Sequence, residues 1–370
     1  MKIAFVSTLE HARWGGSEEL WARTALRLKE RGHEIYISVQ WWQQCAPQVA
    51  NLERVGCRVN YRRPPSLIER VAQKKWPSRK FEWLDVSRPD LVVISQGGYY
   101  DGLRWMEECA ARNINYVTVA QNAPEFHWPE DDILGRVQDS HHKSLANYFV
   151  AQGNIDLVAR QTGNPVQKAK VVRNPFNVAY GARPGWPKDQ HAFRLACVAQ
   201  LLPVHKGQDL IFEVLRLPHW KVRSVQVTLV GKGPNQHSLA ALKARYGLEN
   251  VTFGGFTTNI EEVWAQNHAM ILPSRCEGTP LAVVEAMLCG RMCIVTDVAG
   301  NPEIVEDNIT GFVAAAPTPS LLDEAMERAW GRRTEWKEMG EMAARSIREL
   351  VPSDPIAVFA DELMQVVNFQ

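Results

Sequence analysis

A chain of 370 residues is long for one domain, so two domains of about 180 residues each are expected. Hydrophobic residues make up 45% and charged residues 22% of the chain, a composition typical of a globular protein with an ample core. The net charge of +1 gives no general attraction to nucleic acid. Seven cysteines without a C-x-x-C pair favour neither a disulfide framework nor a zinc site, and suggest a cytoplasmic protein. No apolar run reaches the ~18 residues of a membrane-spanning helix.

The chain opens with a strand, a loop and a helix, followed by a second strand. An apolar run at residues 3–6 precedes a loop that contains Gly15 and Gly16; an amphipathic helical pattern at 18–31 and a strand pattern at 33–39 follow. This order predicts a doubly wound parallel sheet, which binds ligands at the carboxyl ends of its strands. The two glycines let the backbone approach a ligand closely, although a tight turn would need them too. Because G-x-G-x-x-G is absent, NAD is not expected.

Residues 54–80 are strongly basic, with nine lysines and arginines opposed only by Glu69. Apolar residues, among them Trp76, are interleaved with these charges. Such a segment suits an anionic membrane surface or a phosphate-bearing acceptor, which would place the protein at the inner face of a membrane. A solvated surface arm is the alternative interpretation.

Two further buried strands are predicted at residues 91–95 and 115–120. Glycines and Tyr99 follow the first of these strands, and Gln121 follows the second. His127 lies six residues farther on, in a loop. Its ring either reaches inward and contacts a substrate, or belongs to an ordinary loop histidine without a binding role. The loops around Tyr99 and His127 are therefore candidates for ligand binding.

Residues 179–191 contain glycines and prolines among polar residues, which is the composition of a linker. We therefore expect a first domain at residues 1–178 and a second at 192–354. The second domain begins with a strand at 193–199. Lys206 then precedes a glycine at a strand-to-helix junction, a position that suits phosphate binding.

Later strands and a final helix complete the expected second half. A strand at residues 225–230 leads into Gly231, and a strand at 251–256 ends at Phe256. An apolar-striped helix is predicted at about 355–370, after two prolines.

The most informative stretch is a loop and helix that carry two acids, Glu277 and Glu285. Thr279 suits the N-cap position, Pro280 the first helical position and Gly290 the helix end. Between these caps every residue is apolar or small except Glu285, so the helix is expected to be buried and its carboxylate to need a partner. Hydroxyls that flank the phosphate of a nucleotide sugar would meet both acids. Alternatively, Glu285 pairs with a structural arginine and Glu277 is a solvated loop acid.

The pattern Glu277-Gly-Thr-Pro-Leu-x3-Glu285-Ala-Met-x2-Gly290, followed by Gly300-Asn-Pro-Glu303 and Thr310-Gly311, resembles the signature of the retaining, nucleotide-sugar-dependent glycosyltransferases of family four. The two acids match the E-x7-E motif of that family. The resemblance implies the GT-B fold, in which two Rossmann-like α/β domains face each other across a cleft. It places the acceptor on the amino-terminal domain and the nucleotide sugar on the carboxyl-terminal domain, with the terminal helix crossing back onto the first.

The resemblance also implies roles for individual residues. Lys206 would bind the diphosphate, Glu277 would hold a sugar hydroxyl, and Glu285 would accept from the ribose. Gln200 stands where the family usually has an arginine, so either another cation, Arg275 or Arg13, substitutes or the leaving group is stabilised less. Gln121 stands where the family commonly has a histidine. The remaining candidates are Gly278, Thr279, Pro280 and Leu281 at the departing phosphate, Phe256 at the base, Gly231 and Gly16 on the donor side, and Gly15, Gln121, His127 and Tyr99 on the acceptor or sugar side.

The expected function is transfer of a sugar from a nucleoside-diphosphate sugar, with UDP or GDP as the nucleotide, to a hydroxyl of a glycan, glycolipid or small molecule. Retention is implied, and no metal or other cofactor is expected, because no D-x-D motif occurs. Two alternatives remain: a weakened or inactive nucleotide-sugar-binding protein, favoured by Gln200 and Gln121, and a nucleotide-sugar epimerase of the same fold. The donor base and sugar, the acceptor and the oligomeric state stay open.

Overall fold

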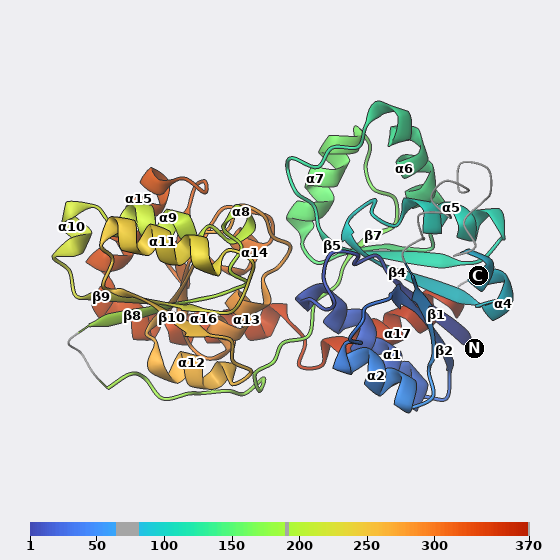
Figure 1. The fold of residues 1–370 in the computed structure, drawn as a ribbon, viewed down its shortest axis with the longest axis horizontal. Helices are drawn as coiled ribbons and strands as arrows, with labels where there is room; N and C mark the ends of the chain where they lie inside the picture. Colours follow the sequence, from blue (N-terminus) through green and yellow to red (C-terminus); the bar gives the residue numbers. More distant parts are fainter. Residues whose placement is uncertain (64–80, 189–191, 369–370) are drawn as a thin grey trace. The chain divides into compact units, whose positions relative to one another are not determined.

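The computed structural model describes residues 1–63, 81–188 and 192–368. It confirms the predicted α/β class, because the chain forms two compact units that each contain a parallel sheet between layers of helices (Figure 1). The first unit comprises Met1–Pro175 and the chain from Asp354 onward, and the second comprises Phe176–Ser353. None of the helices in the described part of the chain combines the length and apolarity needed to cross a membrane.

The first unit is built on a seven-stranded sheet with the order β3-β2-β1-β4-β5-β6-β7. The apolar run of the first strand is buried on both faces, and Phe5 pairs in parallel with Ile37 on one side and Val93 on the other. The strand order therefore reverses between β1 and β4, which marks the point where doubly wound sheets bind ligands. The strands are β1 (Lys2–Ser7), β2 (Glu34–Gln40), β3 (Arg58–Arg62), β4 (Leu91–Gly98), β5 (Tyr116–Asn122), β6 (Asn147–Phe149) and β7 (Ala169–Val171).

Helices cover both faces of this sheet, and Figure 1 shows α1, α2 and α17 on one face and α5, α6 and α7 on the other. The last helix of the chain, α17, packs on α1, and Phe359 lies edge-on to Tyr148 with ring centroids 5.2 Å apart. The chain terminus is thereby part of the first unit. The helices are η1 (Gly16–Glu18), α1 (Glu19–Glu30), α2 (Pro47–Arg54), α4 (Glu82–Ser87), α5 (Leu103–Ala111), α6 (Asp131–Lys143), α7 (Gln152–Thr162) and α17 (Pro355–Asn368).

The second unit has a six-stranded parallel sheet with the order β10-β9-β8-β11-β12-β13, which reverses between β8 and β11. Figure 1 shows α9, α11 and α15 on one face of this sheet and α12 and α16 on the other. The strands are β8 (Phe193–Val198), β9 (Val225–Val230), β10 (Val251–Gly255), β11 (Ala269–Leu272), β12 (Met292–Thr296) and β13 (Gly311–Ala314). The helices are α8 (Pro203–Lys206), α9 (Gln208–Leu215), α10 (Pro218–Lys221), α11 (Gln236–Tyr246), α12 (Ile260–Gln266), α13 (Leu281–Leu288), α14 (Asn301–Ile304), α15 (Pro319–Gly331), η3 (Arg333–Glu335) and α16 (Trp336–Leu350).

The helix that carries Glu285 begins one residue later than predicted. Pro280, rather than Thr279, is the N-cap residue of α13, because its ψ of 120° is still extended, and no side chain caps this end. The prediction that the helix is buried is confirmed, since six of its eight residues are inaccessible, Glu285 among them. The chain leaves the helix at Gly290, whose φ of +73° is left-handed.

The basic segment at residues 54–80 is only partly described. Its first part contains the end of α2 and the strand β3, so this part is not a free surface arm. Arg62 is 7% exposed and donates hydrogen bonds to Ser38 Oγ at 3.0 Å and to the Ser7 carbonyl oxygen at 2.5 Å. The membrane-binding prediction for residues 64–80 lies outside the described residues.

Gly207, between α8 and α9, permits a close contact between two loops of the second unit. Its φ is +67°, and a Cβ there would lie 1.9 Å from the Pro273 carbonyl oxygen. We expect Gly207→Ala to lower the free energy of unfolding of the second unit by about 3 kcal/mol or more, because strain and overlap add. Gly247→Ala is the control, since Gly247 has a similar φ of +62° but open space, and should cost only about 1 kcal/mol. If urea unfolding shows the same loss of unfolding free energy for Gly207→Ala and Gly247→Ala, the close contact at Gly207 is contradicted.

Candidate functional site

The candidate site of the second unit lies where its strand order reverses. The loops after β8 and β11 meet there, and the Arg275 N–H donates to the His205 carbonyl oxygen at 2.7 Å. The neighbouring loop after β12 joins them, since the Gly300 N–H donates to the Gly278 carbonyl oxygen at 2.9 Å. Because the sheet is parallel, the carboxyl ends of these strands share one edge, which is the usual ligand edge of such sheets.

Lys206 and Glu277 form an ion pair at this edge. Lys206 Nζ lies 2.6 Å from Glu277 Oε1, and Ser274 Oγ donates to the same oxygen at 2.7 Å. The Glu277 side chain is 6% exposed, whereas that of Lys206 is 23% exposed. Thr296 fixes the loop by donating to the Ser274 carbonyl oxygen at 2.6 Å. A buried acid therefore holds a partly accessible ammonium group, and an accessible ammonium group can receive a phosphate.

Glu285 is the buried acid of the α13 helix, with 3% of its surface exposed. The backbone N–H and the side-chain amide of Asn177 donate to Glu285 Oε1 at 2.9 and 3.1 Å. Burial raises the pKa of Glu285 to about 7, and the two donors of Asn177 oppose that rise only in part. The predicted need for a partner is confirmed, but the structural-arginine alternative is wrong, because both donors are neutral.

Replacing Asn177 by alanine tests this contact. The variant loses the side-chain donor and keeps the backbone donor, so the free energy of unfolding should fall by about 1–2 kcal/mol at pH 8, where Glu285 is mostly ionised. The loss should be smaller at pH 5, where the carboxyl group is protonated. Urea unfolding at both values measures the difference, and an equal loss at pH 5 and pH 8 would exclude a role in stabilising the carboxylate.

Further predicted donor residues lie at the ends of neighbouring strands. Phe256 follows β10, is 62% exposed, and has Lys232 Nζ 4.6 Å from its ring centroid. Gly231 follows β9 with a φ of +147°, and a Cβ there would lie 2.0 Å from a backbone oxygen. Gln200 is exposed after β8, and its carbonyl oxygen accepts from Gln208 Nε2 at 2.8 Å. These residues share the edge that carries Lys206, but their contacts with a nucleotide stay a prediction.

Of the cations expected to replace the family's arginine, Arg275 is bound to both carboxylate oxygens of Asp209, at 2.7 and 2.8 Å. Its contact with a diphosphate stays a prediction. Arg13 belongs to the first unit, where it donates to Gln44 Oε1 at 3.1 Å. Lys232, which sequence reasoning missed, is an exposed cation at the correct edge, and its position directly after Gly231 was the available signal.

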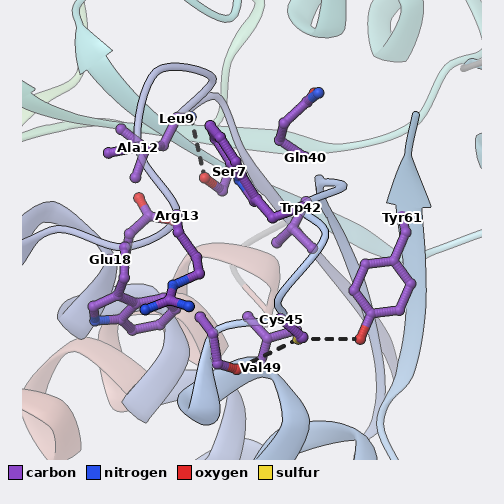
Figure 2. Close-up of a pocket in the computed structure, with 13 residues that line it drawn as sticks. Ser7, Leu9, Ala12, Arg13, Glu18, Gln40, Trp42, Cys45, Val49 and Tyr61 are labelled. Atoms are coloured by element: carbon purple, nitrogen blue, oxygen red, sulfur yellow. Dashed lines mark hydrogen bonds between the residues drawn. The ribbon is translucent and has the colours of Figure 1, made fainter. Parts of the chain in front are cut away.

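The first unit has a pocket at the carboxyl ends of β1, β2 and β3. Figure 2 shows Arg13 and Glu18 on its wall, with Cys45 Sγ lying 3.5 Å from Tyr61 Oη on the other side. Glu18 is 5% exposed, and burial raises its pKa against the hydrogen bond from Ser7. The volume of about 20 Å³ admits a water-sized group. The lining residues are Ser7, Leu9, Ala12, Arg13, Trp14, Glu18, Val39, Gln40, Trp42, Cys45, Ala46, Val49 and Tyr61.

The glycine pair lies on the loop that leads to this pocket. Gly15 has an extended backbone and accepts the Glu18 N–H at 3.0 Å, while Gly16 begins η1 and is exposed. The two glycines thus form the turn that places Glu18 in the pocket wall. This supports the tight-turn interpretation, and ligand contact by Gly15 or Gly16 stays a prediction.

Three other acceptor-side candidates have different environments. Tyr99 has 0% exposure and lies in the hydrophobic core of the first unit, so its predicted place on the acceptor surface is wrong. Gln121 is 9% exposed, and its Oε1 accepts from Asn174 Nδ2 at 2.7 Å. His127 is partly exposed and packs on Tyr100 with ring centroids 4.4 Å apart. Among these three residues, only His127 has an aromatic ring that is partly exposed to solvent. Its contact with a substrate stays a prediction.

One group of side chains in the described residues has the composition of a metal site. Atoms of His219, Asp323 and Glu327 lie within 4.8 Å of one another. However, Arg223 binds both oxygens of Glu327, at 2.6 and 3.0 Å, and Trp220 Nε1 donates to Asp323 Oδ1 at 2.6 Å. A cation would have to displace these donors, so the group is explained as an ion-pair network between α10 and α15.

Comparison with known proteins connects this geometry to a family. Residues 192–331 match the family described as glycosyl transferases group 1. The chain is 32% identical over 133 residues to the N-acetyl-alpha-D-glucosaminyl L-malate synthase of Bacillus anthracis, a match that covers 35% of each protein. It is 29% identical over 147 residues to the alpha-D-kanosaminyltransferase of Streptomyces kanamyceticus, covering 39% of this chain and 38% of that protein. The matches thus span little more than a third of these relatives.

Solved structures match over nearly the whole chain. The Anabaena protein Alr3699/HepE in complex with UDP has a TM-score of 0.76 at 17% identity, covering 99% of this chain and 100% of that one. Its complex with UDP-glucose has a TM-score of 0.75 at 19% identity, covering 99% of both chains. At such identity the likeness concerns the fold. Residues 192–331 therefore match the glycosyl transferases group 1 family, and the chain as a whole has the GT-B fold.

Proposed function

We propose that this protein transfers a glycosyl group from a nucleoside-diphosphate sugar to a hydroxyl acceptor. The observation that carries the proposal is the Lys206–Glu277 pair at the strand reversal of a glycosyl transferases group 1 domain, directly before the helix that buries Glu285. A UDP-sugar is the first choice of donor, because the solved relative Alr3699/HepE is bound to UDP and to UDP-glucose.

In the proposed reaction the bond between the anomeric carbon and the diphosphate oxygen breaks, and the acceptor oxygen bonds to that carbon. The acceptor proton passes to the departing diphosphate, on the same face of the sugar, so the anomeric configuration is retained. Lys206 and the first N–H groups of α13 would stabilise the charge of the diphosphate without a metal, and such fixed donors supply much of the rate in comparable sites. Glu277 would hold a sugar hydroxyl, and Glu285 would accept from the ribose.

The acceptor is proposed to be a carbohydrate or a lipid-linked molecule that binds the first unit. The pocket beside Glu18 admits only a water-sized group, but the side chains that line it, among them Trp14, Trp42 and Arg13, would supply two indole rings and a guanidinium to an acceptor bound over it. The proposal that the acceptor lies in an anionic membrane is based only on the positive charge of residues 54–80. Co-sedimentation with phosphatidylglycerol vesicles tests the proposed membrane association. Binding that does not depend on anionic lipid or on salt concentration would refute it.

The activity is tested by incubating the protein with UDP- and GDP-sugars, with and without simple glycoside acceptors. We expect release of UDP or GDP, a glycosylated product whose new linkage keeps the configuration of the donor, and no loss of rate in EDTA. Conversion of the donor to an isomer without acceptor would identify an epimerase instead. Donor binding without any release of nucleotide would identify an inactive binding protein.

A further inference from the structure

A cavity of the second unit has no part in the proposed transfer reaction. It has a volume of about 440 Å³, within the range of small-molecule sites, and lies between the carboxyl end of α13, the segment 182–186 and one face of α16. We call it the basic pocket, because five of its lining side chains are cationic and one is acidic. The charged lining residues are Arg183, Arg291, Lys337, Arg345, Arg348 and Glu341.

Two of the arginines are fixed parts of the pocket wall. Arg291 is 3% exposed, and its guanidinium donates to backbone oxygens, among them those of Trp264 at 2.8 Å and Gly185 at 2.6 Å. Arg348 likewise donates to the carbonyl oxygens of Tyr180 at 2.9 Å and Leu288 at 2.8 Å. Carbonyl oxygens at the carboxyl end of α13 are among these acceptors, so the helix dipole offsets part of the positive charge, but no carboxylate pairs with either guanidinium among the described residues. Burial lowers the pKa of Arg291 to about 10.

The other three cations are free to contact a ligand. Arg183, Lys337 and Arg345 are exposed, and none forms an ion pair with another described residue. Glu341 lies one turn from both Lys337 and Arg345 on α16, yet it forms no ion pair within 4.0 Å with any described residue. Five cations against one acid leave an excess of four positive charges around the cavity. A phosphate group carries a charge of about −2 at neutral pH, so two phosphate groups would balance this excess.

The basic pocket is separate from the donor site. Both involve α13, but the donor phosphate is expected at its amino end, whereas Leu288, Cys289 and Gly290 at the carboxyl end line the basic pocket. The eight residues of α13 rise about 12 Å. A diphosphate bound to Lys206 would therefore not reach Arg345 or Lys337, and the positive charge of the basic pocket needs an occupant of its own.

We propose that the basic pocket binds a small molecule that carries two phosphate groups. The arginine side chains supply forked donors that match phosphate oxygens, and Trp186, whose ring centroid lies 5.1 Å from the Arg291 guanidinium carbon, supplies a flat apolar wall for the body of the ligand. The same chemistry is offered by a free metabolite and by the headgroup of a phosphorylated lipid. The size and the enclosure by three chain segments favour the free molecule.

The test is calorimetric titration of the full chain with inorganic pyrophosphate in 150 mM NaCl, in the Lys206→Ala background so that the donor site does not compete. The triple variant Arg183→Ala, Lys337→Ala, Arg345→Ala removes the exposed cations of the basic pocket and keeps the two structural arginines. The control is Lys221→Ala, Lys243→Ala, Arg245→Ala, which removes the same charge from α10 and α11.

Saturable binding of one pyrophosphate, weakened at least tenfold by the basic-pocket triple variant and less than twofold by the control, is the expected result. Equal binding to both triple variants, or no saturable binding, would overturn the proposal and leave a solvated basic surface. Sedimentation with vesicles of phosphatidylcholine and 5% phosphatidylinositol bisphosphate distinguishes a free metabolite from the headgroup of a phosphorylated lipid as the ligand. Vesicle binding that needs the three cations, without pyrophosphate binding, would overturn the free-metabolite assignment.

Discussion

Replacing Lys206 by alanine is expected to lower the rate constant of glycosyl transfer by about 10²–10³-fold, the usual effect of removing one fixed donor that stabilises a departing anion. The ammonium group lies 2.6 Å from Glu277, which holds it at the edge of the sheet where the diphosphate is proposed to leave. The charge of the diphosphate grows as the bond breaks, and the effect should therefore be larger on kcat than on KM.

The matched control for this experiment is Lys221→Ala, which removes an exposed lysine from α10, before β9 and thus at the opposite edge of the sheet. Its rate should stay within twofold of the unmodified protein. Thermal unfolding of Lys206→Ala checks that the second unit is intact, since Glu277 keeps its hydrogen bond from Ser274. A kcat within threefold of normal in a folded Lys206→Ala protein would contradict the assignment of the diphosphate site.

Replacing Glu285 by glutamine is expected to alter the dependence of stability on pH. The folded protein raises the pKa of Glu285 from 4.5 to about 7, so between these values the folded state binds more protons than the unfolded state. The contribution of this group to stability is therefore fully present below about pH 4.5 and is lost as the pH rises through 7. A shift of this size corresponds to about 3 kcal/mol.

Urea unfolding at pH 5 and pH 8 measures this effect. Glu285→Gln keeps an oxygen that can accept from Asn177 and removes the titration, so it should be more stable than the unmodified protein by about 2–3 kcal/mol at pH 8. At pH 5 the difference should nearly vanish or change sign. Glu324→Gln, at an exposed position of α15, is the control for the loss of one carboxylate. A difference for Glu285→Gln that is equal at both pH values would refute the raised pKa.

The same substitution should weaken nucleotide-sugar binding, because hydrogen bonds to a charged acceptor are worth roughly 1.5–3 kcal/mol and a neutral amide loses most of that gain. The unmodified protein would thus give up stability at pH 8 to keep an ionised carboxylate in its binding site. Glu285→Gln should thus gain stability at pH 8 and lose affinity for the donor. A purely structural role for Glu285 does not predict this combination.

Local patterns were sufficient to predict the central strands of the sheets and the burial of Glu285, but not the edge strands β3 and β13. The apolar runs that became β1, β4, β5 and β8 lie at the predicted places, since a strand buried on both faces needs a continuous apolar run. Likewise, the apolar residues around Glu285 on α13 required its burial. In each case the determining residues are neighbours in sequence, so the pattern alone contains the information.

Pairings between distant residues were not predictable in the same way. Asn177 and Glu285 are 108 residues apart in the sequence, and Arg275 and Asp209 are 66 residues apart. Only the folded chain shows that Glu285 has a neutral partner and that Arg275 is paired with a carboxylate. Tyr99 follows a strand end that looked accessible, but its ring turns into the core. The residues that decide charge at the site therefore come from the tertiary structure, while the motif only indicates where the site is.

The second unit is proposed to bind a nucleoside-diphosphate sugar through Lys206 and Glu285. Thermal unfolding at pH 8 with a panel of UDP- and GDP-sugars tests this claim most directly. A ligand present at 100 times its dissociation constant stabilises the folded state by about 2.7 kcal/mol. We predict that at least one nucleotide sugar raises the Tm of the unmodified protein and leaves the double variant Lys206→Ala, Glu285→Gln unchanged. Failure of every nucleotide sugar to raise the Tm, or an equal rise in both proteins, would contradict the claim.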